Sequence, residues 1–219
     1  ITNPTKDAEL KTAHFIRDYL TDRGKTCIVD MGTKRIDREG YTYKEQVSLD
    51  IDCIIVLGGD GTLLQAATDL ADREIPFLGV NFGTLGFLAE INKNGIEDAL
   101  EKLIDDDCEI EKRMMLCGRS YGRHNIKDEA RALNDIVITR KGSLQIINFN
   151  IYVNGQFLHR YHADGMIAST PTGSTGYNLS AGGPIVEPKA NLILLSPICP
   201  HSMHSRSIVL SSDDTVIVE

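Results

Sequence analysis

Two glycine-rich loops carry the residue types that can do chemistry in this chain. The first, Gly58-Gly59-Asp60-Gly61-Thr62, follows the apolar run 53–57. Glycine has no Cβ, so backbone N–H groups can close on a phosphate, above all where a helix begins. A carboxylate in a passive phosphate loop would repel the anion, but it is useful if it takes a proton from a hydroxyl that attacks phosphorus. Asp60 is therefore the candidate catalytic base. The candidate contacts for the donor phosphate are Gly58, Gly59 and Gly61.

The alternative for this loop is a plain strand-to-helix turn, because carboxylates are favoured at helix N-termini in any case. The loop is not a Walker A element, since no Gly-Lys-Ser/Thr follows it. We therefore expect the donor phosphates to rest mainly on backbone amides and a metal.

The second loop runs from Ser169 to Tyr177 with the sequence STPTGSTGY, and Ser-Ala-Gly-Gly-Pro follows at 180–184. A turn-rich linker seldom carries so many hydroxyls between apolar strands. We expect a short helix to open near 175–180 and to turn its free amides toward a ligand. Tyr177 can pack on a ring face. The two loops together predict phosphoryl transfer to a nucleotide.

Smaller motifs add candidates with open alternatives. Asn134-Asp135 can hold the two hydroxyls of a ribose, although such a pair is as a rule just a turn. Phe82, in the Gly-rich turn 81–87, either stacks on an adenine or fills the core, whereas Leu85 and Phe87 are expected in the core.

Two histidine pairs, at 159 and 162 and at 201 and 204, invite a zinc interpretation. Neither pair has the Glu and the third ligand of a catalytic zinc site, so no metal-ligating residue is predicted. His162, two residues before Asp164, is expected to border the ligand.

Helices and strands alternate up to residue 108. Apolar spacing predicts helices at 7–22, 62–73 and 95–105 and strands at 26–29, 53–57 and 77–80, with a polar loop at 32–50. This order indicates a Rossmann-like parallel sheet with ligands at the carboxyl ends of its strands. We predict an α/β domain at 1–108 that holds the phosphate loop.

A mostly β domain, a β-sandwich, is predicted at 109–219. Its expected strands are at 131–139, 145–153, 157–161, 165–169, 192–196, 207–210 and 215–218. Asn154-Gly155 is a strong hairpin signal. The chain starts without Met and ends in a strand-like run, so we expect segments to be missing, including the C-terminal part of this domain.

Composition narrows the class of protein. A net charge of −8 argues against a nucleic-acid surface, and no apolar run approaches the ~20 residues of a membrane span. The five cysteines show no CxxC pairing, which is typical of buried, reduced thiols in a cytoplasmic protein.

Taken together, these motifs resemble the NAD kinases of the bacterial type, which use ATP or polyphosphate. The resemblance covers nearly the whole chain, and the 169–184 stretch is its most specific part. It implies phosphorylation of the adenosine ribose 2′-hydroxyl of NAD to give NADP, with Mg²⁺ or another divalent metal, in a homodimeric or homotetrameric enzyme. The NAD-binding residues that it implies are Asp60, Gly61, Phe82, Asn134, Asp135, His162, Asp164, Thr175, Gly176, Tyr177 and Ser180.

Three positions depart from the family pattern. Asn134-Asp135 stands for the usual Asn-Glu, Thr175-Gly176-Tyr177 for Thr-Ala-Tyr, and Ala163-Asp164-Gly165 for Gly-Asp-Gly. Two other functions compete. A lipid or sphingoid kinase of the same superfamily would lack the 169–177 loop, and a regulatory protein that binds NAD or NADP would gain nothing from Asp60.

Overall fold

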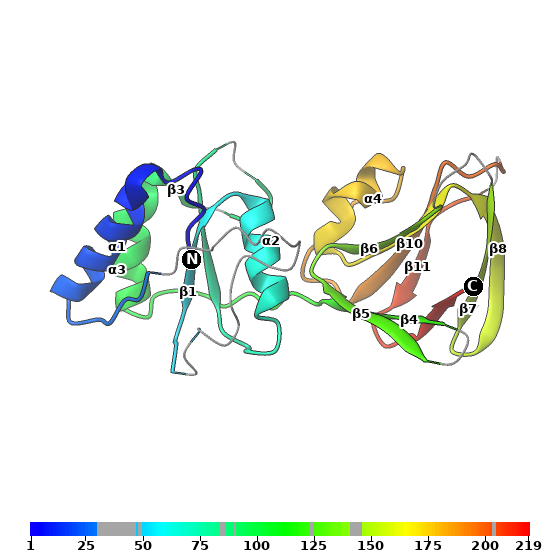
Figure 1. The fold of residues 1–219 in the computed structure, drawn as a ribbon, viewed down its shortest axis with the longest axis horizontal. Helices are drawn as coiled ribbons and strands as arrows, with labels where there is room; N and C mark the ends of the chain where they lie inside the picture. Colours follow the sequence, from blue (N-terminus) through cyan, green and yellow to red (C-terminus); the bar gives the residue numbers. More distant parts are fainter. Residues whose placement is uncertain are drawn as a thin grey trace. The chain divides into compact units, whose positions relative to one another are not determined.

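The computed structural model describes residues 1–29, 47, 50–83, 86–89, 91–122, 125–140, 146–202 and 205–219. These form two compact units, Ile1–Ile110 and Glu111–Glu219, which follow one another in the colour sequence of Figure 1. Leu85, His204 and nearly all of the predicted loop at 32–50 lie outside the described residues.

The first unit is built on a parallel sheet of β1 (Ile54–Gly58), β2 (Phe77–Asn81) and β3 (Ile91–Asn92), in the order β1-β2-β3. The N-terminal segment extends this sheet, because Thr2 forms a parallel bridge with Leu57. Its helices are α1 (Lys11–Asp22), which follows the 3₁₀ turn Ala8–Leu10, α2 (Asp60–Asp69), and α3 (Ile96–Ile104), which follows the 3₁₀ turn Lys93–Gly95. The predicted α/β class is confirmed.

Alternation along β1 explains why helices cover both faces of the sheet. Leu57 packs with the apolar stripes of α1 and α3, whereas Ile54 and Val56 pack with α2. Successive strand residues point to opposite faces, so a strand buried on both sides reads as a continuous apolar run. Figure 1 shows α1 and α3 together on one side of β1 and α2 on the other.

The predicted strand at 26–29 was wrong. These residues form no strand, and Ile28 is 70% exposed. Cys27 and Val29 pack against the core beside α1 and α3, but none of the described strands pairs with this segment.

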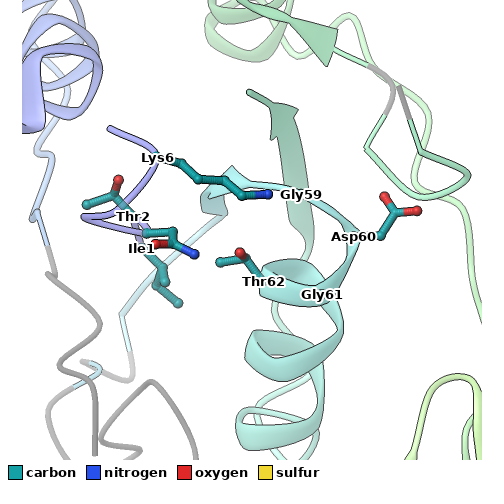
Figure 2. Close-up of a pocket in the computed structure, with 8 residues that line it drawn as sticks. Ile1, Thr2, Lys6, Gly59, Asp60, Gly61 and Thr62 are labelled. Carbon is teal, nitrogen blue, oxygen red and sulfur yellow. The ribbon is translucent and has the colours of Figure 1, made fainter. Parts of the chain in front are cut away.

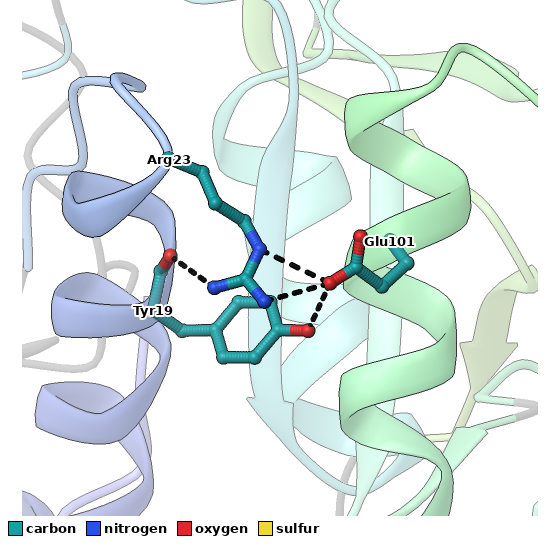
Figure 3. Close-up of polar contacts among 3 residues, drawn as sticks. All are labelled: Tyr19, Arg23 and Glu101. Carbon is teal, nitrogen blue, oxygen red and sulfur yellow. Dashed lines mark hydrogen bonds and ion pairs between the residues drawn. The ribbon is translucent and has the colours of Figure 1, made fainter.

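Helices α1 and α3 are also joined by a polar contact, shown in Figure 3. Glu101 on α3 accepts hydrogen bonds from the Tyr19 hydroxyl and from Nε and Nη2 of Arg23 at 3.0 and 2.8 Å. The Arg23 guanidinium lies 3.6 Å from the centre of the Tyr19 ring. The hydrogen bond raises the pKa of Tyr19, and the same bond, with those from Arg23, lowers the pKa of Glu101.

This contact predicts an acid-dependent loss of stability. A carboxyl group whose pKa is lower in the folded state adds stability above its unfolded pKa of about 4.3, and that stability is lost as the pH falls through the folded pKa. Glu101→Gln should therefore lower Tm at pH 7, and its difference from wild type should shrink at acid pH. Thermal melts from pH 7 to 3 check this, with exposed Glu109→Gln as the control. A Tm difference that does not vary with pH would contradict the role of the Glu101 charge.

The described residues of the second unit form three antiparallel groups of strands. A hairpin pairs β4 (Leu116–Tyr121) with β5 (Ile126–Ala132). A four-stranded sheet has the order β11 (Ile208–Ser211), β10 (Leu192–Ile198), β9 (Gly165–Ser169) and β6 (Asp135–Thr139). A three-stranded sheet has the order β12 (Val216–Val218), β7 (Ile147–Val153) and β8 (Gln156–Ala163).

The four- and three-stranded sheets share one apolar core, as the predicted sandwich requires. The core takes inward residues from both sheets: Phe149, Ile151, Tyr161, Ala163, Met166, Ile193 and Leu195. The predicted hairpin at Asn154-Gly155 is confirmed, with φ of 51° and 79° and Val153 paired to Gln156. The predicted strand at 131–139 is instead the end of β5 and all of β6, and β4 was not predicted.

The cysteines lie in different environments. All five are free thiols, and Cys108, Cys117 and Cys199 are exposed, so the expectation of burial was wrong for these three. Burial raises the pKa of the Cys53 thiol to about 11. No helix among the described residues is long and apolar enough to cross a membrane.

Candidate functional site

The loop after β1 is a tight turn that only glycine permits at its first position. A Cβ on Gly58 would lie 2.4 Å from Oγ1 of Thr62. The N–H groups of Thr62 and Leu63 both donate to the Gly59 carbonyl, at 2.9 and 3.2 Å, and helix α2 begins at Asp60. The strand therefore passes into the helix with the first amides of α2 at the carboxyl end of the sheet.

A cavity of about 290 Å³ opens at this turn, as Figure 2 shows. It lies between the loop and the N-terminal segment, and its lining residues are Ile1, Thr2, Asn3, Lys6, Gly59, Asp60, Gly61 and Thr62. The first N–H groups of a helix have no acceptor within it, and the helix dipole favours an anion there. The cavity suits a phosphate.

Lys6 adds a cation to this cavity. A Cβ on Gly59 would lie 2.9 Å from Nζ of Lys6, so the missing side chain of Gly59 lets the ammonium approach the loop. Hydrogen bonds on both sides of Lys6 fix its backbone. The Lys6 N–H donates to the Asn3 carbonyl. The buried Asp7 carboxylate accepts the N–H groups of Thr12 and Ala13, each at 3.0 Å. Lys6 was not predicted from the sequence, because in a Walker A loop the lysine follows the glycines, whereas Lys6 lies far before them in the chain.

The Asp60 carboxylate points away from Lys6 and Thr62, as Figure 2 shows. Its Oδ2 accepts the N–H of Phe87 at 2.9 Å, and its Oδ1 accepts the N–H of Leu88 at 3.4 Å. The cation and the carboxylate therefore lie on different sides of the loop, and the backbone after β2 holds the carboxylate. This geometry places a fixed carboxylate next to a cavity whose lining suits an anion.

The two phenylalanines of the turn at 81–87 have different environments. Phe82 packs against the core shared by α1 and α3, and Nζ of Lys93 lies 4.5 Å from its ring centre. Phe87 is 72% exposed, so its predicted place in the core was wrong. The inward position belongs to Leu88, which packs on the core beside α2.

In the second unit, Asn134 and Asp135 meet the 169–177 loop. The Thr170 N–H donates to the Asn134 carbonyl at 2.8 Å, and Asp135 opens β6 opposite Ser169. A Cβ on Gly173 would lie 2.2 Å from that same carbonyl oxygen. Gly173 therefore lets the loop backbone lie directly on Asn134.

The side chains of Asn134 and Asp135 both lie beside Gly176. A Cβ there would be 3.4 Å from Nδ2 of Asn134 and 3.7 Å from Oδ2 of Asp135. Oδ1 of Asn134 is buried and has no hydrogen-bond partner in the described part of the chain, and burial raises the pKa of Asp135. Buried acceptors normally have a donor, so this pair suits a ligand that brings hydroxyl groups.

Asn178, which sequence reasoning did not single out, holds the loop in shape. Its side chain is fully buried, donates to the carbonyls of Ser174 and Pro184 at 3.2 and 3.0 Å, and accepts the Ser196 hydroxyl at 2.6 Å. The loop contains the 3₁₀ turn Thr172–Thr175 and the short helix α4 (Tyr177–Ser180). Only an amide with a donor and an acceptor end satisfies this set.

The remaining predicted residues are spread around this loop and the end of β8. Tyr177 is 45% exposed, and the Thr175 hydroxyl donates to the Thr172 carbonyl at 3.4 Å. The Asp164 carboxylate accepts a hydrogen bond from Nη1 of Arg140 at 2.7 Å. The His162 carbonyl accepts a hydrogen bond from the His201 backbone N–H. Ser180 is exposed. The described residues contain no group of three or more His, Cys, Asp or Glu that could hold a metal ion.

Asn178→Ala should destabilise the second unit by on the order of 3 kcal/mol, because it leaves the Ser174 and Pro184 carbonyls without their donor and leaves the Ser196 hydroxyl with only its contact to Ser207. Urea unfolding measures this change in the free energy of unfolding. The exposed Asn191→Ala should stay within about 0.5 kcal/mol of wild type. If both variants unfold alike, Asn178 does not organise the loop.

Two family models match the chain. The ATP-NAD kinase N-terminal domain matches residues 1–108, and the ATP-NAD kinase C-terminal domain matches residues 133–219. An NAD kinase from Lachnospira eligens is 46% identical over 222 residues, and one from Lachnoclostridium phytofermentans is 49% identical over 226 residues. Both matches cover 100% of this chain, with 75% and 77% of those proteins.

Solved structures agree with this likeness. An NAD kinase from Archaeoglobus fulgidus in complex with ATP superposes with a TM-score of 0.76 at 28% identity, over 95% of this chain and 77% of that one. A yeast NADH kinase complexed with NADH has a TM-score of 0.72 at 34% identity, over 77% of this chain and 50% of that one.

Proposed function

Since the chain belongs to the NAD kinase family and is a phosphotransferase that converts NAD to NADP with ATP, we propose that Asp60 is its general base. The observation that carries this proposal is the fixed carboxylate at the start of α2, held by two backbone N–H groups next to the cavity that Lys6, Gly59 and Gly61 line. Each carboxylate oxygen has a further lone pair for a proton.

In the proposed reaction, Asp60 accepts the proton of the adenosine ribose 2′-hydroxyl of NAD. The 2′-oxygen forms a bond to the γ-phosphorus of ATP while the bond from that phosphorus to the β–γ bridging oxygen breaks. The products are NADP and ADP, and the proton remains on Asp60 until solvent removes it. Phosphoryl transfer depends more on the positioning of the reacting groups and on charge neutralisation than on a strong base.

The donor phosphates are proposed to occupy the cavity after β1. Gly59 and Gly61 line this cavity, and their amides, with that of Gly58 at the end of β1, would face the phosphate oxygens. The Lys6 ammonium would neutralise part of the phosphate charge. A divalent ion such as Mg²⁺ would arrive on the phosphates themselves, because Mg²⁺ is usually held by substrate phosphates with at most one or two carboxylates. Polyphosphate, which offers the same oxygens, is a second proposed donor.

The second unit is proposed to contribute ribose contacts to NAD. Asn134 and Asp135 would take ribose hydroxyls, because one has a buried unpartnered acceptor and the other a half-buried carboxylate. The 1–108 domain would hold the donor and the 109–219 domain most of the dinucleotide. The proposed NAD contacts are Asp60, Gly61, Phe82, Asn134, Asp135, His162, Asp164, Thr175, Gly176, Tyr177 and Ser180. Family membership supports two further proposals, a cytoplasmic location and a homodimer or homotetramer.

Asp60→Asn should lower kcat by roughly 10²–10⁴-fold and leave NAD binding intact, because the amide keeps the shape of the side chain but cannot accept the proton. NADP formation and NAD titration measure the two effects. Asp98→Asn is the matched control, since Asp98 also lies in the first turn of a helix in this unit and is exposed. Full activity in Asp60→Asn would remove Asp60 from the role of base.

Lys6→Met should raise KM for ATP and lower kcat/KM for ATP by roughly 10–100-fold, because a charge-assisted contact is worth about 1.5–3 kcal/mol. KM for NAD should stay within about twofold of wild type. Steady-state kinetics with each substrate varied checks this, with Lys11→Met, an exposed lysine of α1, as the control. An equal rise in both KM values would contradict a role for Lys6 at the donor phosphates.

A further inference from the structure

Gly86 lies directly against the carboxyl group of Asp60. A Cβ built on Gly86 would be 2.2 Å from Oδ1, 2.2 Å from Oδ2 and 2.3 Å from Cγ of Asp60, and these are its three nearest heavy atoms. A methyl group and the carboxylate cannot share this space, because core packing already places atoms at van der Waals contact.

Gly86 differs from the glycines that serve a positive φ. Gly24, Gly155 and Gly182 have positive φ, and a Cβ on any of these three would meet nothing within 4 Å. The matched position is Gly95, in the same unit, where a Cβ would meet only ordinary contacts at 3.8 Å. At Gly86 the space taken by the Asp60 carboxyl group is what excludes a side chain.

The close approach at Gly86 brings two donors to Asp60. The N–H groups of the next two residues, Phe87 and Leu88, are the ones that bond to the two carboxylate oxygens. A side chain at Gly86 would push the carboxylate away from both donors. Displacement of a reacting group by about 1 Å can cost on the order of 10²-fold in rate.

We propose that Gly86 is a positioning residue for Asp60: its missing side chain allows the backbone at 86–88 to set the orientation of the carboxylate. This inference rests on the proposed role of Asp60 as the base. Gly86 acts through Asp60 and touches no substrate in the proposal.

The kinetic test is Gly86→Ala. We expect kcat to fall roughly 10–100-fold, with KM for NAD and for ATP within about threefold of wild type, and Gly95→Ala to keep wild-type kinetics. An unchanged kcat in Gly86→Ala would overturn the proposal, and so would a loss confined to KM.

A double-mutant cycle of thermal stability tests the contact between Gly86 and Asp60 independently of catalytic activity. Wild type, Gly86→Ala, Asp60→Ala and the double variant are melted side by side. Gly86→Ala should lower Tm by a few degrees in the wild-type background, and it should leave Tm unchanged or higher in the Asp60→Ala background, where the space is free. Equal effects in the two backgrounds would show no coupling and would overturn the proposal.

The outcomes separate this inference from the proposed function. If Asp60→Asn is fully active but the cycle shows coupling, the role of base fails while the Gly86–Asp60 contact stands. If Gly86→Ala does not fold but the double variant does, the clash is with the carboxylate, as proposed. If neither folds, something other than Asp60 blocks a side chain at Gly86, and the proposal is wrong.

Discussion

The hydrogen bonds from the Phe87 and Leu88 amides to the Asp60 carboxylate are the interaction on which the rest of the site depends. They join the loop after β1 to the segment after β2, two neighbouring parallel strands whose carboxyl ends meet at one edge of the sheet. Such edges are where open α/β sheets bind ligands. Two close approaches make the contact possible: Gly58 allows Thr62 to fold back onto β1, and Gly86 leaves space for the carboxylate. The proposed chemistry therefore depends on where side chains are absent as much as on where they are present.

Charge is divided around this contact in a way that suits phosphoryl transfer. Lys6 and the first amides of α2 face the cavity, whereas the Asp60 carboxylate lies on the other side of the loop. A carboxylate inside the anion site would oppose phosphate binding, and Coulomb repulsion at short range is strong where water is scarce. In the proposed mechanism, the lysine that a Walker A loop supplies from its own sequence is Lys6 of the N-terminal segment. The likeness to NAD kinases in both domains favours this enzyme over the lipid kinase and the non-catalytic binding protein that the sequence left open.

Local chemistry made much of the fold predictable. A few neighbouring residues were enough to predict several elements: the apolar stripes of α1 and α3, the buried run of β1 and the Asn154-Gly155 turn. The failures needed tertiary information. Residues 26–29 have a strand-like pattern but form no strand, and Phe87 is exposed because Leu88 takes the inward position. Within the candidate site, Asp60, Asn134 and Asp135 were predicted from their residue types, and their roles remain proposals. Lys6, Gly86 and Asn178 were missed, because their importance comes from partners 53, 26 and 18 residues away along the chain.

The central claim is that Asp60 takes the proton from the adenosine ribose of NAD, and a structure of the complex tests it most directly. In crystals of the chain with NAD, the account predicts a carboxylate oxygen of Asp60 within about 2.6–3.2 Å of the 2′-hydroxyl, or linked to it through one water. A bound NAD whose 2′-hydroxyl faces another side chain, with Asp60 out of reach even through a water molecule, would contradict it.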